Sequence, residues 1–581
     1  MSVAEEVKIG LEIHQQLDTC KLFCNCPTEL TDTHDFTFTR FFRPTHSELG
    51  GLDRAALQEF RKGRKVVYHA NLASSCAVEW DEEPPHPLNT KALEIALQFT
   101  RMMASTPVDE IQVMRKILID GSAVSGFQRT ALVATGGVVP GTKVRVDSIC
   151  LEEDSSRPVN GEHLSQSERV FNVDRLGTPL IEVATLPDIT SGEQAREVAL
   201  KIGEALRMLK VKRGLGTIRQ DINISIPDGA RVEIKGVQDL SLIPKLVEFE
   251  VNRQKRLFIL SERIRQTSPG KPLEVTGIFT KTDSKIFKGQ KVFAMTFSSA
   301  TGLFAEPMHP GKHLGRELAE YVRAHGFRGF VHTDEDMTKY KLESELEAVK
   351  KIMGCRQTDL LALSAGSAEP LNLVAERLSQ LVSGVTEDTR KCELDGSSSF
   401  LRPLPTGARM YPETDIPPIK PFRVPMPETP EQRLVRLKKV LPEQLALKLH
   451  ISPDYNLFCE LGGHPFLGEV FTEHLPALRR RGLEVNRSHL EQLVHLYKGQ
   501  KGGALLDLLQ KVVKGEEMKS QVSDEVVRQF VKSLVHQKQD FIKNTPSPEK
   551  GLMGLVMQEF RGRFPGQQLL AILKEELEKV N

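Results

Sequence analysis

The chain has 581 residues, which predicts several domains, about four at the usual length of about 100 to 200 residues. Its 78 Lys and Arg residues nearly cancel its 77 Asp and Glu residues, and 39% of the chain is hydrophobic. These values exclude general disorder and an overall basic coat, so any contact with RNA must be a local patch.

The sequence predicts a cytoplasmic protein without a membrane span. Its start, MSVAEEVKIG, has no basic segment followed by an apolar run, so neither a signal peptide nor a transit peptide is expected. No window approaches the roughly 18 uninterrupted apolar residues of a membrane helix. Eight cysteines are too sparse for a disulfide scaffold and fit reduced thiols.

The first predicted element is a strand over VKIGLEIHQQL, residues 7–17. Alternate residues of a strand share a face, so the aliphatic residues point one way while Glu12 and His14 point the other. A solvent-facing strand of an antiparallel sheet shows the same alternation. Support for a functional face must therefore come from other strands.

Three cysteines follow this strand in CKLFCNC, namely Cys20, Cys24 and Cys26, and Cys76 lies further along the chain. Four thiolates could bind a structural zinc ion. The spacing is irregular and lacks a second clustered pair, so free buried thiols are expected and zinc is not.

Up to about residue 267, short alternating strands are broken by Gly and Pro turns, with predicted helices near 88–104 and 190–209. This mixture indicates an α+β sheet domain. Within it, RKILIDGSAVSGFQRT at 115–130 combines cations with a loop of small residues, which could let backbone N–H groups and hydroxyls approach an anion. A plain surface loop with basic neighbours would have the same sequence. The pattern G-x-x-x-x-G-K-[ST] does not occur, so this is not a P-loop protein.

Four later segments repeat the design of the first strand, with aliphatic residues alternating with polar ones. They are VRVDSICLEEDSSR, TPLIEVATLP, TIRQDINISI and ARVEIKGV, the last two joined through the turn PDGA. Their selected polar residues are Glu152, Glu153, Glu182, Arg219, Asp221, Asn223, Glu233 and Lys235. We interpret these faces, together with that of the first strand, as the walls of one site.

Carboxylates with a single imidazole and no paired cysteines suit Mg²⁺ or Mn²⁺ better than zinc. Such an ion, flanked by Arg and Lys, neutralises a transferring phosphoryl group. Ion pairs between neighbouring strands, such as Arg219 with Glu233, would produce the same pattern without any site.

Parity in VRVDSICLEEDSSR does not decide which acid faces the ion. Counting from Val146 places Glu152 on the apolar side, whereas counting from Leu151 places Glu153 there. A β-bulge between the two halves of the strand could resolve the conflict.

The segment from about residue 268 has a different character, with a linker, the strand-like VFAMTF, and amphipathic helices predicted near 312–325 and 341–353. Pro-rich extended chain then returns, which is typical of an insertion into a parent domain. The remainder is helical, with a break near GQKGG. The predicted domains are a sheet domain (1–267 and 396–424), an inserted α+β domain (268–395), a helical domain (425–500) and a helical tail domain (501–581).

Six segments carry a resemblance to a known family. They are KIGLEIHQQLDTCKLFCNCPTEL, FFRPTHSELGGLDRAALQEF, IDGSAVSGFQRTALVATGG, LGTPLIEVATLPDI, TIRQDINISI and ARMYPETDIPP. Together they closely resemble the B/E subunit family of tRNA-dependent amidotransferases over essentially the whole chain. The SELG segment, the SGFQRT loop and the insertion are similar to its archaeal E branch.

The resemblance implies that the sheet domain is a cradle related to glutamine synthetase and the guanido kinases. The cradle would use ATP and a divalent cation to phosphorylate the γ-carboxylate of glutamate misacylated onto tRNA(Gln), and ammonia would displace the phosphate. This is the activity of a carbon–nitrogen ligase that takes its amide from glutamine. An asparaginase-like D subunit would make the ammonia, in a heterotetramer of two D and two E subunits. The inserted domain resembles that of bacterial-type aspartyl-tRNA synthetases, and the tail resembles the family's tRNA-binding tail.

Site residues are carried over by motif, as the resemblance implies. The metal ligands would be Glu12, His14, Glu152 or Glu153, and Glu182, which with Arg219, Asp221 and Lys235 form the catalytic set. The nucleotide would be handled by Arg115, Lys116, Ser125, Arg129, Asn223 and Glu233. The zinc-type cysteine pattern of some bacterial B subunits is only half present here.

Two other functions fit parts of the sequence. One is a non-catalytic tRNA-binding or assembly protein. The presence of Glu12, His14 and Glu182 argues against it, because a protein that had lost catalysis would have lost these ligands. The other is a ligase acting on a free amino acid. The helical tail argues against it, because a small substrate does not require an additional helical domain for binding. Basic segments such as RRRG and RGRFPG offer cations to a phosphate backbone, although solvated helix ends explain them equally well.

Overall fold

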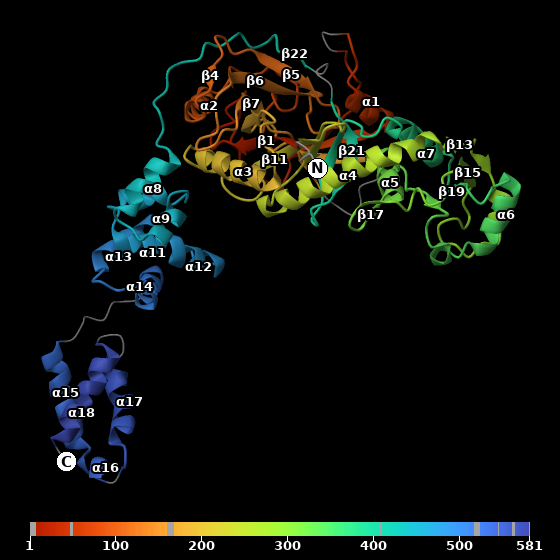
Figure 1. Ribbon diagram of the computed structural model, residues 1–581. Helices are drawn as coiled ribbons and strands as arrows, with labels where there is room; N and C mark the ends of the chain where they lie inside the picture. The colour runs from red at the N-terminus through yellow and green to blue at the C-terminus, as the bar shows by residue number, and fades with distance from the viewer. Residues whose placement is uncertain are drawn as a thin grey trace, which may run out of the picture. The chain divides into compact units, whose positions relative to one another are not determined.

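The computed structural model describes residues 7–46, 50–159, 168–405, 410–515, 523–543, 545–560 and 564–579 (Figure 1). It divides into two units, residues 1–433 and 434–581. The described residues form a mixed α/β structure with several sheets. Among the described helices, none is both long and apolar enough to cross a membrane.

The main sheet of the first unit has 11 strands in the described part of the chain. Neighbouring strands are antiparallel, except that β12 and β20 run parallel. The order is β21 (Ser398–Pro403), β20 (Asp388–Cys392), β12 (Val232–Lys235), β11 (Ile218–Ser225), β1 (Lys8–Gln16), β10 (Pro179–Thr185), β7 (Val146–Glu153), β6 (Phe127–Thr135), β5 (Val113–Ile117) and β22 (Met410–Pro412), with β4 (Thr106–Pro107) beside β6.

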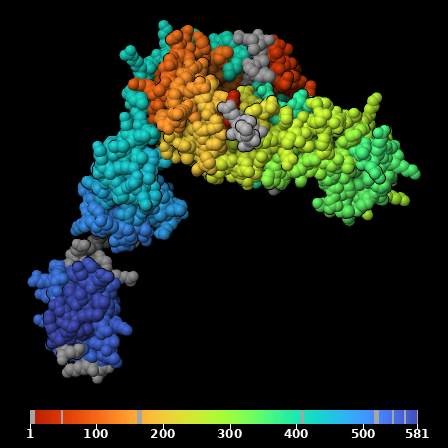
Figure 2. All heavy atoms as spheres, in the orientation of Figure 1, coloured from red at the N-terminus to blue at the C-terminus, as the bar shows by residue number. Residues whose placement is uncertain are grey.

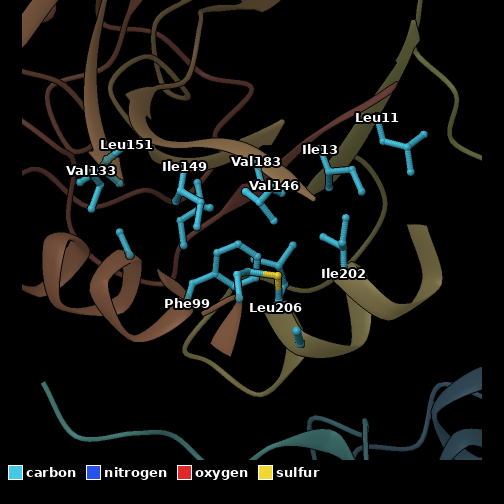
Figure 3. Close-up of a cluster of buried hydrophobic side chains, with 14 of the residues drawn as sticks. Leu11, Ile13, Phe99, Val133, Val146, Ile149, Leu151, Val183, Ile202 and Leu206 are labelled. Atoms are coloured by element: carbon cyan, nitrogen blue, oxygen red, sulfur yellow. The ribbon is translucent and has the colours of Figure 1, made fainter. Parts of the chain in front are cut away.

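The aliphatic faces of the central strands form the core, as their alternation predicts. Ile13, Ile149 and Val183 are buried there against Phe99 of α2 (Thr90–Met102) and Ile202 of α3 (Gly192–Arg207), as Figure 3 shows. Both helices begin at predicted positions, where the side chains of Asn89 and Ser191 accept hydrogen bonds from N–H groups of the first turn. The polar faces of the same strands are left for the opposite side of the sheet.

A bulge between β7 and β10 resolves the parity conflict. Ala184 pairs with Ser148 but Thr185 pairs with Val146, so Asp147 is the extra residue. Val146 and Leu151 therefore both reach the core although their numbers differ in parity. The predicted bulge is confirmed, and it places Glu152 on the polar face.

Helix α4 (Ile243–Arg265) was not predicted, although it is the longest helix described. Its buried face includes Glu250, Arg253 and Gln254, so the apolar period that identifies a helix is weak. In Figure 2 the yellow-green atoms of this part of the chain adjoin the green atoms of the segment that follows.

The segment after α4 forms a second sheet in the order β13 (Ser268–Pro269), β15 (Val292–Ser298), β19 (Leu360–Ala365), β18 (Val331–His332), with β14 (Leu273–Glu274) also beside β15. Its helices are α5 (Leu314–Ala324), α6 (Glu343–Met353) and α7 (Glu369–Leu381), and the first two confirm the predicted helices. A hairpin of β16 (Pro307–His309) and β17 (Lys312–His313) precedes α5. Because β20 already pairs with β12, the main sheet resumes before residue 395, the predicted end of the insertion.

A smaller sheet in the first unit has the order β2 (Phe36–Arg40), β3 (Lys65–Ala70), β9 (Glu168–Asn172), β8 (Arg157–Pro158). Helix α1 (Arg54–Arg61) lies between β2 and β3 in the chain and begins at Asp53, whose side chain accepts a hydrogen bond from the Ala56 N–H.

The second unit is helical in its described part. One hydrophobic cluster is built on α8 (Pro430–Lys438), α9 (Glu443–Leu449), α10 (Tyr455–Glu460), α11 (Pro465–Glu469), α12 (Leu475–Arg480), α13 (Arg487–Leu496) and α14 (Gly503–Val513). Another is built on α15 (Asp524–Gln537), α16 (Gln539–Lys543), α17 (Pro548–Phe560) and α18 (Gly566–Glu578). Leu505 and Leu509 of α14 belong to the first cluster, so its packing continues past residue 500, where a boundary was predicted.

Candidate active site

A cavity of about 450 Å³ opens on the polar face of the main sheet, within the size range of small-molecule sites. Strands β1, β11 and β12 and strands β5, β6 and β7 supply its walls. The predicted residues that line it are Glu12, His14, Lys116, Glu152, Arg219, Asp221, Asn223, Glu233 and Lys235. Residues from five separate strands of the sequence thus meet at one place.

His14 lies at the centre of a group of carboxylates. Its Nε2 atom is 3.0 Å from Glu182, 3.5 Å from Glu12 and 3.9 Å from Glu152. The β1–β10 register sets His14 beside Glu182, and the bulge in β7 brings the fully buried Glu152 to the same face. Lys116 pairs with Glu152, and its Nζ atom is 3.6 Å from Glu182.

The crowding of charges shifts the pKa values of this group. Burial, followed by the charge of Glu182, raises the pKa of Glu12 to about 7. Burial opposes a charge on His14, but the hydrogen bond and charge of Glu182 raise its pKa to about 9. Burial also disfavours a charge on Glu182, yet Lys116 and His14 hold its pKa well below the ordinary value. Around His14, three carboxylates therefore share the imidazole and the ammonium group of Lys116.

Two sets of donor atoms here could hold a cation. Glu12, His14 and Asp221 form one set, and His14, Glu152 and Glu182 form the other, with the atoms of each set within 4.8 Å of one another. Carboxylate oxygens with one imidazole suit Mg²⁺ or Mn²⁺. The residues present therefore fit the predicted ion.

Cations line the cavity along β11 and β12, the strands that follow β1 in the sheet. Lys235 lies 2.5 Å from Asp221 and 2.8 Å from Glu233. Arg219 donates to the buried Asp154 at 2.8 Å, so the alternative pairing of Arg219 with Glu233 is not the one that forms. These pairs hold the ammonium and guanidinium groups in place at the cavity.

Four further residues of the site were not among the predicted site residues, although the sequence places Asp154 near Glu152 and Arg231 on the polar face with Glu233. Gln128 donates to Glu152 at 3.1 Å, and Asp154 accepts from Gln16 at 2.7 Å. Arg231 and Arg402 line the cavity. Strand alternation could have identified Gln128, but Arg402 reaches the cavity from β21, beyond the inserted segment, and no local signal marks it.

Of the two neighbouring acids between which the sequence did not decide, Glu153 lies outside the group around His14. It follows Ile149 and Leu151 on the face opposite the cavity. Its carboxylate accepts from the backbone N–H of Arg129 at 2.9 Å and lies 3.6 Å from the guanidinium of Arg129. Alternation along β7 thus separates the two neighbouring acids, and Glu152 is the one that meets His14.

Of the six residues predicted to handle the nucleotide, three lie away from the cavity, namely Arg115, Ser125 and Arg129. Arg115 donates to the buried Glu413 at 2.8 and 2.5 Å, and Arg129 donates to it at 2.7 Å. Ser125 donates to the carbonyl of Phe127 at 3.1 Å. Lys116, Asn223 and Glu233 line the cavity, whereas Arg115 and Arg129 form a cross-strand pair on the other face.

The cysteine cluster differs from the four thiolates considered above. Donor atoms of Cys24, Cys26, Cys76 and Glu79 lie within 4.8 Å of one another, and Cys20 is exposed outside this group. The Cys24 thiol donates to Glu79 at 3.0 Å, and burial with this neighbour raises the pKa of Cys24. The absence of zinc stays a prediction.

Comparison with known proteins gives a consistent result. A family described as the GatB/GatE catalytic domain matches residues 7–423. The E subunit of glutamyl-tRNA(Gln) amidotransferase from Archaeoglobus fulgidus is 41% identical, with 98% of each chain covered. Proteins of the same name from Thermococcus gammatolerans and Methanocaldococcus jannaschii are each 39% identical, with 99% of this chain and 98% and 99% of theirs covered.

Proposed function

Because this chain belongs to the GatB/GatE family, we propose that the cavity on its main sheet activates the glutamate carried by Glu-tRNA(Gln) for conversion to Gln-tRNA(Gln). The chain is a ligase subunit of a tRNA-dependent amidotransferase, which works with other subunits and with tRNA. Similarity over essentially its full length to subunits of that name disfavours a ligase for a free amino acid.

The chemistry requires an activated carboxylate. A carboxylate does not accept ammonia at neutral pH, because its leaving group would resemble oxide. In the proposed first step, a γ-carboxylate oxygen of the glutamate forms a bond to the terminal phosphorus of ATP, and the bond from that phosphorus to ADP breaks. Ammonia then bonds to the acyl carbon and loses a proton. The bond between the acyl carbon and the bridging oxygen breaks, so phosphate leaves with the former carboxylate oxygen.

The cations of the cavity bind the phosphates in this proposal. Lys235 and Arg219 are held by buried acids, so their charges are preorganised and need no reorganisation as the phosphoryl group transfers. The buried Nε atom of Arg402 has no hydrogen-bond partner among the described residues, and a phosphate oxygen would supply one. Asn223 and Glu233 line the same wall.

Glu12, His14, Glu152, Glu182 and Asp221 would hold Mg²⁺ or Mn²⁺. Bound there, the ion neutralises phosphate charge. The raised pKa of Glu12 is consistent with this role, because a carboxylate that is buried and lies near another acid accepts a cation readily. Lys116 pairs with Glu152 and keeps that carboxylate facing His14.

The remaining assignments rest on family resemblance. We place this first unit in the cradle class that includes glutamine synthetase and the guanido kinases, with the domain limits predicted above. An asparaginase-like D subunit would supply ammonia in a heterotetramer of two D and two E subunits, in the cytoplasm. Residues 501–581 would serve tRNA binding.

The convergence of Glu12, Glu152 and Glu182 on His14, which lines the cavity, carries the proposal. The test is amidation by the purified chain with ATP, Mg²⁺ and added ammonium chloride, with Glu-tRNA(Gln) compared with Asp-tRNA(Asn). We expect Gln-tRNA(Gln) to form with ADP, and no comparable product from Asp-tRNA(Asn). Formation of Gln-tRNA(Gln) without ATP consumption would overturn the proposal.

A further inference from the structure

The inserted segment contains a second cavity, of about 840 Å³, that has no part in the reaction described above. Helix α5 forms one wall, and β18 with residues 333–340 forms another. Rings and cations line it together: Phe330 and Tyr340 contribute rings, and Arg316, Arg323 and Lys339 contribute charges. Such a combination suits a ligand that has both a planar ring and a negative charge.

The ring wall is a cluster of Phe304, Phe330 and His332. Phe304 meets Phe330 edge to face with ring centres 6.1 Å apart, and it meets His332 in the same way at 5.1 Å. Phe304 is fully buried and supports the other two, whereas Phe330 is only half-buried. Phe330 therefore offers ring surface to the cavity.

His332 presents a polar atom that lacks a partner. Its side chain is 6% exposed, and its Nδ1 atom has no hydrogen-bond partner among the described residues. Its Nε2 atom lies 3.2 Å from Glu335, and burial lowers the pKa of the imidazole, which favours the neutral ring with its proton on Nε2. Nδ1 is then an acceptor, and an N–H group of a ligand would satisfy it.

The acids around this cavity are already satisfied by the protein. Asp334 accepts from the backbone N–H groups of Gly302 and Phe304 at 2.8 and 2.9 Å. Glu335 accepts from the hydroxyl of Tyr340 at 2.6 Å. Asp336, the third acid of the lining, accepts from Thr338 at 2.6 Å and lies 3.9 Å from Lys339. The acids thus hold the loops of the cavity in place, and Arg316 and Arg323 are the cations left to face a ligand.

The cations of α5 are open to solvent. Arg316 and Arg323 are two turns apart on one face of the helix, with Ala319 between them. The side chain of Arg316 is 65% exposed, and its ion pair to Glu320 is long, at 3.8 Å. No salt bridge of Arg323 is found in the part of the chain that the structure describes.

An adjoining cavity of about 710 Å³ extends this surface. It shares Arg323, Phe330 and Tyr340 with the first cavity, and it adds Lys285 and Arg328. The two cavities together form one groove, lined by basic side chains along its length and by rings at its centre. A single small anion would use only part of it.

We propose that this groove, here called the insertion groove, binds an unpaired nucleotide of RNA together with the phosphates that flank it. The base would lie against Phe330 and donate an N–H to His332 Nδ1, while Arg316, Arg323 and Arg328 contact phosphates. Unstacked bases bound on aromatic rings and read through their edges are the usual mode of single-stranded RNA recognition. The choice of tRNA(Gln) as the source of this nucleotide rests on the proposed function.

The test uses the full chain and tRNA(Gln) that carries 4-thiouridine, crosslinked by light and mapped by mass spectrometry. The test variant is Arg316→Glu with Arg323→Glu. The control is Lys351→Glu with Arg356→Glu, which makes the same charge change at exposed residues of the inserted segment outside both cavities. Free AMP and ribose 5-phosphate are added separately as competitors.

We expect crosslinks to the peptide that contains Phe330, reduced about tenfold in the test variant and unchanged in the control. AMP should compete weakly and ribose 5-phosphate not at all. Equal crosslinking in both variants would overturn the insertion groove. Competition by AMP at concentrations as low as those of the tRNA would overturn RNA as the source, in favour of a free nucleotide. ATP-dependent amidation is measured on the same samples. If the wild-type chain shows no amidation, the proposed function is refuted, but the crosslinking result for the insertion groove stands.

Discussion

Replacing Glu182 by Gln is the sharpest perturbation of the proposed site, because it removes one charge and almost no volume. Glu182 lies 3.0 Å from His14 Nε2 and 3.6 Å from Lys116 Nζ. With an effective dielectric constant of about 20, opposite unit charges 3.6 Å apart attract by about 4 to 5 kcal/mol. Glu182 would act on a bound cation with an energy of the same order, and losing that interaction in the transition state slows the reaction by about 10³-fold.

The assay measures ADP formed from ATP in the presence of Glu-tRNA(Gln) and ammonium chloride, with tRNA affinity measured separately. We expect Glu182→Gln to lose about 10³-fold in rate while tRNA binding persists. The matched control is Glu197→Gln, an exposed position on α3 that should keep full activity. A Glu182→Gln variant within about threefold of wild-type rate would refute the assignment of Glu182 to the reacting site.

Three further predictions concern other parts of the chain. Arg253→Met should lower the stability of the first unit by about 3 to 5 kcal/mol, because the buried Glu317 loses its partner at 2.6 Å; an unchanged melting temperature would contradict this. The pKa of buried His332 is lowered from its ordinary value of 6.5, so the unfolded chain binds more protons and the stability that His332 contributes above that value is lost as the pH falls through the lowered pKa. Calorimetry should show the inserted segment melting lower near pH 5.5 than near pH 7.5, and His332→Phe should weaken this dependence. Deleting residues 523–581 should weaken tRNA affinity at fixed salt and leave the melting of the first unit unchanged; equal affinity would remove tRNA binding from the tail.

Strand alternation in the sequence was sufficient to predict much of the candidate site. In β1, β10, β11 and β12 one face must enter the core, so the other face is fixed without knowledge of the tertiary structure. His14 and Glu182 are 168 positions apart, yet each could be placed on a polar face from its own segment. What alternation does not predict is which strands are neighbours, and the β1–β10 and β1–β11 pairings supply that.

Errors arose where local sequence and tertiary environment disagree. Arg115 and Arg129 were expected at the nucleotide because they are cations beside a small-residue loop. Both instead donate hydrogen bonds to the buried Glu413, which is about 300 residues away in sequence. Helix α4 was missed because its buried face carries charged residues that find partners only in the folded chain, such as Arg253 with Glu317. Such partners are determined by long-range packing, and the hydrophobic periodicity of a single segment carries no information about it.

The central claim is that the chain phosphorylates a carboxylate before ammonia attacks, and isotope transfer tests it directly. Glu-tRNA(Gln) labelled with heavy oxygen in the γ-carboxylate is amidated by the chain with ATP and ammonium chloride, and the released phosphate is analysed by mass spectrometry. We predict that each phosphate released carries one labelled oxygen and that the nucleotide product is ADP. Unlabelled phosphate, or label recovered in AMP, would contradict the account.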